Sequence, residues 1–296
     1  MRPSRRRCLD GARRAFVPGL LSVLVALAVL LGSTGCAGSG ASAGELTVAG
    51  STTVMPIAEI AAEQFTEHTG IHVLVSGLGS SAGIESVLNG TADIATSSRD
   101  LTEAEKSTGE LVTTEVATDG IAVIVNTQNR VANVTMDQLR AIYAGQITNW
   151  KELGGEDLPI LVVNRDEASG TREAFKTIVM GDTRFDPAAA VLPGTGQVRD
   201  VVSRTPGAIG YISLGFVDSA FTSAKVKALA VNSVEPSEAA VEAGAYPVSR
   251  YLYFFTKGEP SGTAKEYIAL VVSDEMAQTI RDAGYIPISA ERKGGE

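Results

Sequence analysis

Two hydrophobic patterns alternate along the chain from about residue 45 onward. Short runs rich in valine, isoleucine and alanine, at residues 45–48, 71–75 and 92–96, are typical of buried strands. Between them, apolar residues at helical spacing predict one helix that ends at Gly70 and a shorter one that begins at about Gly83. This alternation predicts an α/β protein with mixed, mostly parallel sheets, whose ligands bind at the C-terminal ends of the strands.

The same alternation continues to the end of the chain. We expect strands at residues 121–126, 160–163, 208–213 and 251–255, and helices from about Thr171, at residues 197–203 and, as the last of the chain, from about Thr263. The Thr102-x-x-Glu105 spacing is a capping box and predicts one more helix start. We therefore expect two lobes with helices on both faces of their sheets and a cleft between them. Lobe I would comprise residues 46–126 and 246–296, and lobe II residues 127–245.

The first 35 residues have the pattern of an export signal. Six arginines precede a nearly uncharged segment, residues 15–32, and small residues follow it. The Gly35-Cys36 pair resembles the lipobox of bacterial lipoproteins, with Ser33 at the position where that motif prefers leucine. We expect cleavage before Cys36, lipidation of that cysteine and a flexible tether over residues 36–45. Cleavage without lipid and a retained membrane anchor are the alternatives.

Net charge restricts which partners the exported part can bind, and cysteine content restricts its disulfide bonds. Loss of the first 35 residues removes six arginines and one aspartate and moves the formal net charge from −9 to −14. A chain this acidic is a poor partner for nucleic acid or for an anionic membrane surface, so an anion would have to be attracted locally. Only Cys36 of the two cysteines would remain, which excludes an internal disulfide.

The turn after the second predicted strand admits three functional interpretations. Gly77-x-Gly79-x-x-Ala82 matches a dinucleotide-binding fingerprint, and Gly79-x-Ser81-x-Gly83 matches the nucleophile elbow of serine hydrolases. The third is an oxyanion seat made of serine hydroxyls, backbone N–H groups and a helix N-terminus.

Neither enzyme motif has its partners elsewhere in the sequence. An elbow hydrolase has its histidine after the nucleophile, whereas the two histidines, His68 and His72, both precede Ser81. The dinucleotide fingerprint is not on the first strand–helix unit, and it would leave two further hydroxyl-rich turns without a role. We therefore expect a binding protein with no catalytic residues, metal or cofactor.

Three hydroxyl-rich turns share the chemistry of an oxyanion seat. They are Ser51-Thr52-Thr53, Ser80-Ser81 and Ser169-Gly170-Thr171, each before a predicted helix. Helix capping is the ordinary role of such residues, and it is our interpretation of Ser261-Gly262-Thr263, which follows no strand directly. Two arginines near the turns, Arg165 and Arg99, could hold an oxyanion by charge-assisted hydrogen bonds. Arg99 could instead pair with Asp100.

Six segments, in this order, resemble the phosphate-binding lipoproteins of phosphate ABC importers, in the periplasmic-binding-protein superfamily. They are AGSTTVMPIAE, GLGSSAGIESVLNGTADIATSSRDL, IYAGQITNWKELGG, NRDEASGTREAF, PGAIGYIS and YLYFFTKG. The resemblance extends from about Leu46 to Ile288 and implies a type 2 periplasmic-binding-protein fold, with phosphate buried between two lobes.

The resemblance also implies roles for individual residues. The phosphate ligands would be Thr52, Thr53, Ser80, Ser81, Arg165, Ser169, Gly170 and Thr171, with Ser51, Ser98 and Arg99 as further candidates in the same loops. Glu167 would pair with the binding arginine, Arg165. The best-known members have an aspartate that accepts the phosphate proton and so excludes sulfate, and Ser98 stands at that position here. Asp100 and Asp119 are candidates for the missing acceptor.

The function that the resemblance implies is that of an exported receptor. It would be anchored to the outer face of the cell membrane through Cys36, capture inorganic phosphate and deliver it to the permease and ATPase subunits of an ABC importer. We expect a monomer with no nucleic-acid partner, closing through hinge segments near residues 125–127 and 245–250. The alternatives are a receptor for another tetrahedral oxyanion, such as sulfate or molybdate, and a phosphate sensor.

Overall fold

The computed structural model describes residues 45–217 and 225–288, which lie within one compact unit formed by residues 43–296. The expected signal, the lipidation site at Cys36 and nearly all of the tether lie outside the described residues, so these expectations stay predictions. Within the described part of the chain, no helix is long and apolar enough to cross a membrane.

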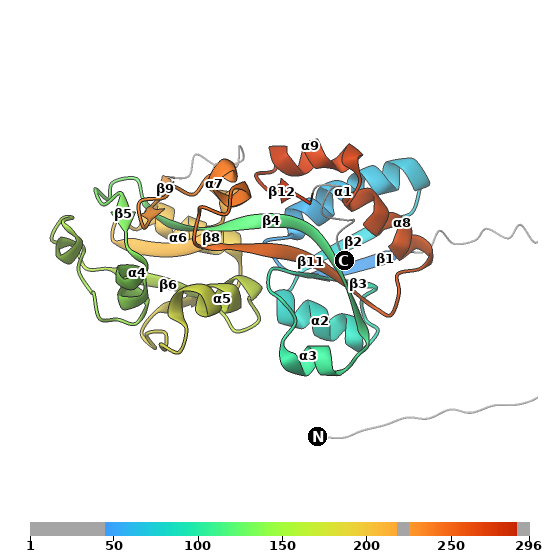
Figure 1. Cartoon of the computed structure of the whole chain (residues 1–296), viewed down its shortest axis with the longest axis horizontal. Helices are drawn as coiled ribbons and strands as arrows, with labels where there is room; N and C mark the ends of the chain where they lie inside the picture. The colour runs from blue at the N-terminus through green and yellow to red at the C-terminus, as the bar shows by residue number, and fades with distance from the viewer. Residues whose placement is uncertain (1–44, 218–224, 289–296) are drawn as a thin grey trace, which may run out of the picture. The chain divides into compact units, whose positions relative to one another are not determined.

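One mixed sheet forms the centre of this unit (Figure 1). Its strands, with those of a small second sheet, are β1 Leu46–Gly50, β2 Val73–Gly77, β3 Ile94–Ser97, β4 Leu111–Asn126, β5 Asn133–Val134, β6 Leu161–Arg165, β7 Ala190–Leu192, β8 Ala208–Ser213, β9 Val226–Ala228, β10 Ala230–Val231, β11 Ser249–Lys257 and β12 Ile286–Pro287. The main sheet has the order β2-β1-β3-β11-β4-β8-β6-β7, with β12 and β9 also paired to β4, while β10 pairs with β5. Its flanks are parallel and its centre is antiparallel, which confirms the α/β class with a mixed sheet.

Helices connect most of these strands. They are α1 Met55–Thr69, α2 Ser80–Leu88, α3 Glu103–Ser107, α4 Met136–Tyr143, α5 Gly170–Phe175, α6 Thr195–Arg204, α7 Glu238–Glu242, α8 Gly262–Val271 and α9 Asp274–Asp282. A π-helical turn, Lys176–Met180, continues α5, and short 3₁₀ turns occupy Trp150–Leu153 and Leu214–Phe216.

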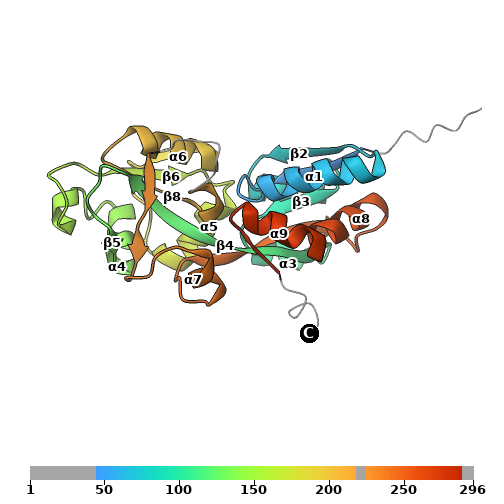
Figure 2. The same ribbon diagram turned by 90° about the horizontal axis from the view of Figure 1, so that it is seen from above.

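Two lobes share the main sheet, and each has helices on both faces (Figures 1 and 2). Alternate residues of a strand face opposite sides of a sheet. In one lobe, Val48 of β1 belongs to the core under α1, α8 and α9, and the adjacent Ala49 belongs to the core under α2. In the other lobe, Val123 of β4 packs with α4 and α5, and Ile124 packs with α6. Each lobe therefore has two buried layers around its part of the sheet.

Strands β4 and β11 pass through both lobes (Figure 1). β4 pairs with β11 as far as Gly120 and with β8 from Ile121 to Val125, so the change of partner falls inside one 16-residue strand. Residues 125 and 126, where we expected a hinge, are the paired end of this strand beside β9. The pattern predicted only the second half of β4, because only that half is buried on both faces.

Three other elements test the expected helix boundaries. Thr102 caps α3 by a capping box with Glu105, as predicted. Helix α2 begins at Ser80, three residues before the expected start, after Gly79 adopts a φ of 93° that favours glycine. The last helix is not the one that begins near Thr263, because Ser273 caps a further helix, α9.

Helix α2 lies unusually close to β1, and Gly83 makes this approach possible. A Cβ atom at Gly83 would lie 2.5 Å from the carbonyl oxygen of Ala49 and 2.5 Å from the Cα atom of Gly50. Because both atoms belong to the backbone of a central strand, neither can move aside without displacing the loop that follows β1.

We predict that Gly83→Ala lowers the free energy of unfolding by about 1–3 kcal/mol, because the added methyl group overpacks the contact between α2 and β1. Thermal or urea unfolding followed by circular dichroism measures this change. Gly196→Ala is the matched control, since Gly196 is also helical and has no atom within 4 Å of its added Cβ. It should be neutral or stabilising by up to about 1 kcal/mol. Equal stability of both variants would contradict the close approach.

Candidate functional site

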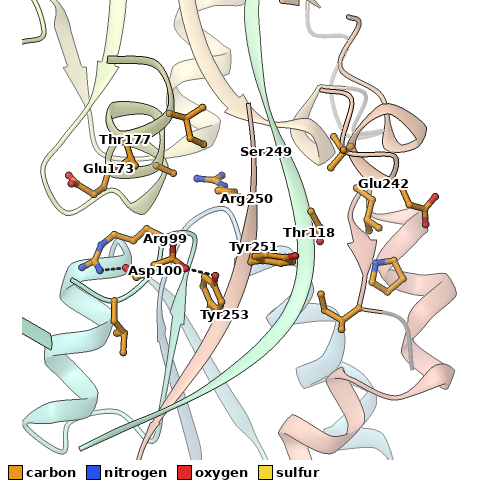
Figure 3. Close-up of a pocket in the computed structure, with 18 of the residues that line it drawn as sticks. Arg99, Asp100, Thr118, Glu173, Thr177, Glu242, Ser249, Arg250, Tyr251 and Tyr253 are labelled. Carbon is orange, nitrogen blue, oxygen red and sulfur yellow. Dashed lines mark hydrogen bonds between the residues drawn. The ribbon is translucent and has the colours of Figure 1, made fainter. Parts of the chain in front are cut away.

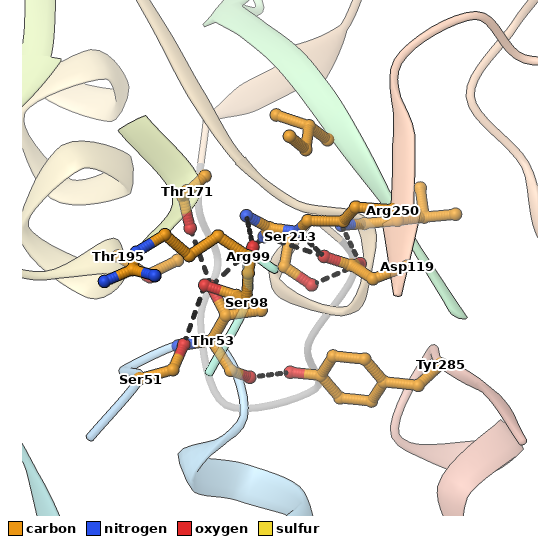
Figure 4. Close-up of polar contacts among 12 residues, drawn as sticks. Ser51, Thr53, Ser98, Arg99, Asp119, Thr171, Thr195, Ser213, Arg250 and Tyr285 are labelled. Carbon is orange, nitrogen blue, oxygen red and sulfur yellow. Dashed lines mark hydrogen bonds and ion pairs between the residues drawn. The ribbon is translucent and has the colours of Figure 1, made fainter. Parts of the chain in front are cut away.

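The carboxyl ends of β1, β2, β3, β6 and β7 meet where the two lobes face each other, and hydroxyl-bearing residues follow each of these ends. We call them the hydroxyl cluster: Ser51, Thr52, Thr53, Ser80, Ser98, Ser169, Thr171 and Thr195. All except Thr52 are at most 3% exposed. Figure 4 shows several of them around one point, together with two ion-paired neighbours.

Hydrogen bonds inside the cluster join residues that are far apart in the sequence. Within the first lobe, Ser51 Oγ donates to Ser98 Oγ at 2.9 Å, and the backbone N–H of Ser98 donates to Ser80 Oγ at 3.1 Å. Thr53 Oγ1 and Thr171 Oγ1 lie 3.0 Å apart, across the junction between the lobes. The predicted turns are therefore brought together.

A fourth loop belongs to the cluster and was missed in the sequence. Thr195 opens α6, and its Oγ1 lies 3.0 Å from Thr52 Oγ1 in the opposite lobe. Its segment, Pro193-Gly194-Thr195-Gly196, follows β7 and precedes a helix, so it has the same strand, turn and hydroxyl order as the other three. The short edge strand β7 is what the hydrophobic pattern failed to show.

Glycine at position 170 allows the two lobes to approach. A Cβ atom there would lie 2.2 Å from Ser80 Oγ, and the backbone N–H of Ser81 donates to the Ala168 carbonyl at 3.2 Å. The turn before α2 therefore packs directly on the turn before α5. Any larger residue at position 170 would displace the Ser80 hydroxyl.

The capping interpretation explains only part of the cluster. Ser169 caps α5, because its Oγ accepts from the backbone N–H of Arg172. The N-cap residues of α1 and α2 are Val54 and Gly79, and neither makes a side-chain capping bond. The hydroxyls of Thr53 and Ser80 lie beside these helix N-termini without capping them. First-turn N–H groups and hydroxyls of this kind are typical of anion-binding sites.

Arg165 is a buried cation in the same cluster. It is 2% exposed, and its side chain donates to the carbonyl groups of Leu192 and Pro193 at 3.1 and 2.8 Å. Its remaining donors reach Thr195 Oγ1 at 3.3 Å and Thr52 Oγ1 at 3.4 Å. Burial lowers the pKa of Arg165, although arginine stays charged at neutral pH.

No carboxylate among the described residues forms an ion pair with Arg165, so the expected pairing with Glu167 is wrong. Glu167 is exposed and lies 3.9 Å from Arg172 instead. Asp166 and Glu167 lie in the turn that follows β6. This turn directs the Glu167 side chain outward, whereas Arg165, at the end of β6, points inward. Asp166 attracts the guanidinium from beyond ion-pair distance, so the charge of Arg165 is only partly balanced. A buried guanidinium without an ion pair favours the binding of an anion.

Arg99 and Ser81 form a separate ion-pair cluster beside α3. Both terminal nitrogens of Arg99 donate to Glu105 at 2.8 Å, and Nη2 also donates to Ser81 Oγ at 3.0 Å. Arg99 also donates to the backbone carbonyl of Asp100 but not to its carboxylate, so the expected alternative pairing does not form. The exposed carboxylate of Asp100 accepts a hydrogen bond from the Tyr253 hydroxyl instead. The structure therefore places Ser81, Arg99 and Asp100 next to the hydroxyl cluster without bringing their side chains into it.

Asp119 is fully buried and paired with an arginine that the sequence analysis missed. Arg250 Nη2 donates to Asp119 Oδ2 at 2.9 Å, and Ser213 Oγ donates to Oδ1 at 2.7 Å (Figure 4). Burial raises the pKa of Asp119, and Arg250, Ser213 and the N–H of Leu214 act against this rise. In the sequence, the only signal of this pair was that Arg250 stands alone beside the apolar segment of β11.

A groove of about 1020 Å³ lies beside the site, along the strands that join the lobes. Figure 3 shows Tyr251 and Tyr253 of β11 on its floor, with Glu173 and Thr177 of the other lobe at one side. Of the residues described above, Arg99, Asp100 and Arg250 reach it. The hydroxyl cluster itself is buried rather than lining this groove.

Comparison with known proteins identifies the family of this chain. Residues 36–275 match the PBP superfamily domain. The phosphate-binding protein PstS of Bacillus subtilis is 35% identical over 84% of this chain and 82% of its own length. The chain belongs to the PBP superfamily, in the PstS family.

Solved structures give the same result. A substrate-binding protein from Clostridium perfringens, solved with bound phosphate, has a TM-score of 0.78 and 35% identity, covering 83% of this chain and 100% of its own. An ABC-type phosphate transport receptor from Vibrio cholerae has a TM-score of 0.68 and 37% identity, covering 82% of this chain and 100% of its own. The two-lobed periplasmic-binding-protein fold expected from the sequence is confirmed.

We predict that Glu105→Gln lowers the free energy of unfolding at pH 7 by about 1–3 kcal/mol, because it leaves the buried Arg99 guanidinium without its counter-charge. Thermal unfolding measures the loss, with Glu103→Gln as the control, since Glu103 pairs with Lys106 at the surface.

The same variant has an expected pH dependence. Burial raises the pKa of Glu105, but hydrogen bonds from Arg99 and Thr102 lower it by more than burial raises it. The pKa of Glu105 in the folded protein is therefore below its ordinary value of 4.5. A lowered folded-state pKa stabilises the protein above the unfolded pKa and loses this effect as the pH falls through the folded pKa. The difference between wild type and Glu105→Gln should therefore shrink below about pH 4.5. A difference independent of pH would contradict the ion pair.

Proposed function

We propose that this protein is an extracytoplasmic receptor that captures inorganic phosphate between its two lobes and delivers it to an ABC importer. The single observation that carries the proposal is Arg165, a buried guanidinium without a carboxylate partner among the described residues, surrounded by hydroxyls from both lobes. The names of the PstS relatives and the phosphate bound in a similar structure support the choice of anion. The protein is a binding protein and not an enzyme.

The proposed phosphate ligands are the inward-facing groups of the four loops and of Ser98, which follows β3. They are Thr52, Thr53, Ser80, Ser98, Arg165, Ser169, Gly170, Thr171 and Thr195, with Ser51 behind Ser98. Hydroxyls and N–H groups can surround a buried dianion with short hydrogen bonds while the protein as a whole remains acidic. Arg165 contributes the positive charge that the bound anion requires.

The proton of hydrogen phosphate has no evident carboxylate acceptor among the candidates. Asp119 already accepts four hydrogen bonds, two from Arg250 and one each from Ser213 and Leu214. Asp100 is exposed. Hydroxyl lone pairs, such as those of Ser98, are the acceptors that remain in the cluster. We therefore infer weaker discrimination against sulfate than an aspartate at this position would give.

We propose the lobe boundaries expected from the sequence, with one refinement. The buried clusters support a division in which β4 belongs to both lobes, because Val116 and Ala117 pack in one core and Ile121, Val123 and Val125 in the other. Strand β11 packs in the first core, and Val248, directly before it, packs in the second. Closing of the lobes would bend these strands near Gly120, where β4 changes partner. The contacts between Thr53 and Thr171 and between Thr52 and Thr195 hold the lobes together in the present arrangement.

Attachment to the membrane through a lipidated Cys36 and a monomeric state are further proposals. The first rests on the Gly35-Cys36 motif after an apolar segment. A tether of small residues would let the folded part reach a permease in the same membrane.

We predict that Arg165→Ala weakens phosphate binding by about 2 kcal/mol or more, roughly 30-fold, because the anion loses its charge-assisted hydrogen bonds. Isothermal titration calorimetry with phosphate, sulfate and molybdate on residues 37–296 measures both affinity and selectivity. Arg204→Ala is the control, because Arg204 lies in the same lobe and its ion pair is at the surface. Unchanged affinity of Arg165→Ala would exclude this arginine, and tighter binding of sulfate or molybdate than of phosphate would overturn the proposed substrate.

A separate prediction concerns the anchor. Cys36→Ala should release a processed or soluble form of the protein, because the substituted residue has no thiol to carry lipid. Fractionation of cells that express each form, followed by immunoblotting of membrane and medium, measures the change. Ser33→Ala is the control, since it keeps the cysteine. Full retention of Cys36→Ala in the membrane would indicate an uncleaved anchor.

A further inference from the structure

Arg250 is a second buried guanidinium at the hydroxyl cluster. Its side chain is 5% exposed and lies on β11, directly opposite Asp119 of β4 in the strand register. Its Nε and Nη2 both donate to Asp119 Oδ2, at 3.2 and 2.9 Å. Arg250 is therefore held rigidly at the place where β4 passes from one lobe to the other.

The charge of Arg250 is already balanced. Asp119 is fully buried, and all of its hydrogen-bond partners are donors from Arg250, Ser213 and Leu214. The pair contributes little net charge to the site, which distinguishes Arg250 from Arg165. Any role of Arg250 in the site must therefore come from the hydrogen bonds that its remaining N–H groups donate.

Two of those N–H groups reach the loops that carry hydroxyls. Nη1 donates to the Ser98 carbonyl at 3.1 Å, and Nη2 donates to Thr53 Oγ1 at 3.3 Å. A guanidinium can only donate hydrogen bonds, so Thr53 Oγ1 is the acceptor in this contact. The hydroxyl proton of Thr53 is then available for another acceptor. Thr171 Oγ1 of the opposite lobe lies 3.0 Å away, and either of these two hydroxyls could be the donor.

We propose that Arg250 is a positioning residue of the anion site, which sets the Thr53 hydroxyl as a hydrogen-bond donor to the bound phosphate and fixes the Ser98 loop beside it. This inference rests on the proposed function. In this proposal the Asp119–Arg250 pair orients the Thr53 hydroxyl and the Ser98 loop, whereas Arg165 supplies the positive charge that compensates the anion.

A double-mutant cycle between Arg250 and Thr53 tests this role. Phosphate affinity is measured by isothermal titration calorimetry for wild type, Arg250→Lys, Thr53→Val and the double variant. Arg250→Lys keeps the charge but loses the planar fork, and Thr53→Val removes the hydroxyl at nearly constant volume. Each single variant should weaken binding about 10-fold or more. The double variant should lose clearly less affinity than the two single losses multiplied together, because both changes remove the Thr53 donor. Any loss beyond that of Thr53→Val reports the contact of Arg250 with the Ser98 loop.

Controls separate positioning from a purely structural effect. Thr53→Ser keeps the hydroxyl and should retain most of the affinity, whereas loss of stability alone would not distinguish serine from valine. Arg281→Lys, at a surface ion pair with Glu242, should leave affinity unchanged. Circular dichroism establishes that each variant is folded. If Arg250→Lys does not fold, Asp119→Asn takes its place in the cycle, because it loosens the same guanidinium.

The outcomes distinguish this inference from the proposed function. Unchanged affinity of Thr53→Val, or equal effects of Arg250→Lys with and without the Thr53 hydroxyl, would overturn the positioning role while phosphate binding by wild type stands. Failure of the wild-type protein to bind phosphate would overturn the proposed function itself. Strong coupling between the two positions, together with binding by wild type, supports both.

Discussion

The positive charge of Arg165 is buried at the junction of the two lobes, and none of the described carboxylates pairs with it. Its hydrogen bonds go to two carbonyl groups of the segment after β7 and to the hydroxyls of Thr195 and Thr52. These neutral groups orient the guanidinium without cancelling its charge. An acidic protein can therefore attract an anion at one point, because the attraction depends on local desolvated charge rather than on net charge.

The sheet topology provides the setting for that charge. Parallel strands on the two flanks end at the junction, and each is followed by a turn and a helix. The antiparallel centre, β4 and β11, connects the flanks and carries the Asp119–Arg250 pair across them. The two guanidinium groups thus have different roles. The charge of Arg165 is available to the ligand, because no ion pair neutralises it. The charge of Arg250 is neutralised by Asp119, and its remaining N–H groups donate hydrogen bonds to Thr53 and Ser98.

Local patterns predicted much of this arrangement. Three of the four hydroxyl loops, the capping box at Thr102 and the two-lobed α/β class were all readable, because strand length, helix spacing and turn chemistry are local properties. Thr195 was missed because its strand is only three residues long, and Arg250 because a single arginine in an apolar strand has no local partner. The pairing of Glu167 with Arg165 failed because adjacent turn residues need not point the same way.

The sequence alone determined which residues bear hydroxyls at helix starts, which segments are buried, and that histidine is absent from any position a hydrolase of this type would need. Only the tertiary structure decided which of these groups face one another: Thr53 with Thr171, Arg99 with Glu105 rather than Asp100, and Asp119 with Arg250. The physical reason is the sequence distance between partners. Contacts between residues 53 and 171 or 119 and 250 depend on strand order and on how two lobes close, and local propensity carries no information about either.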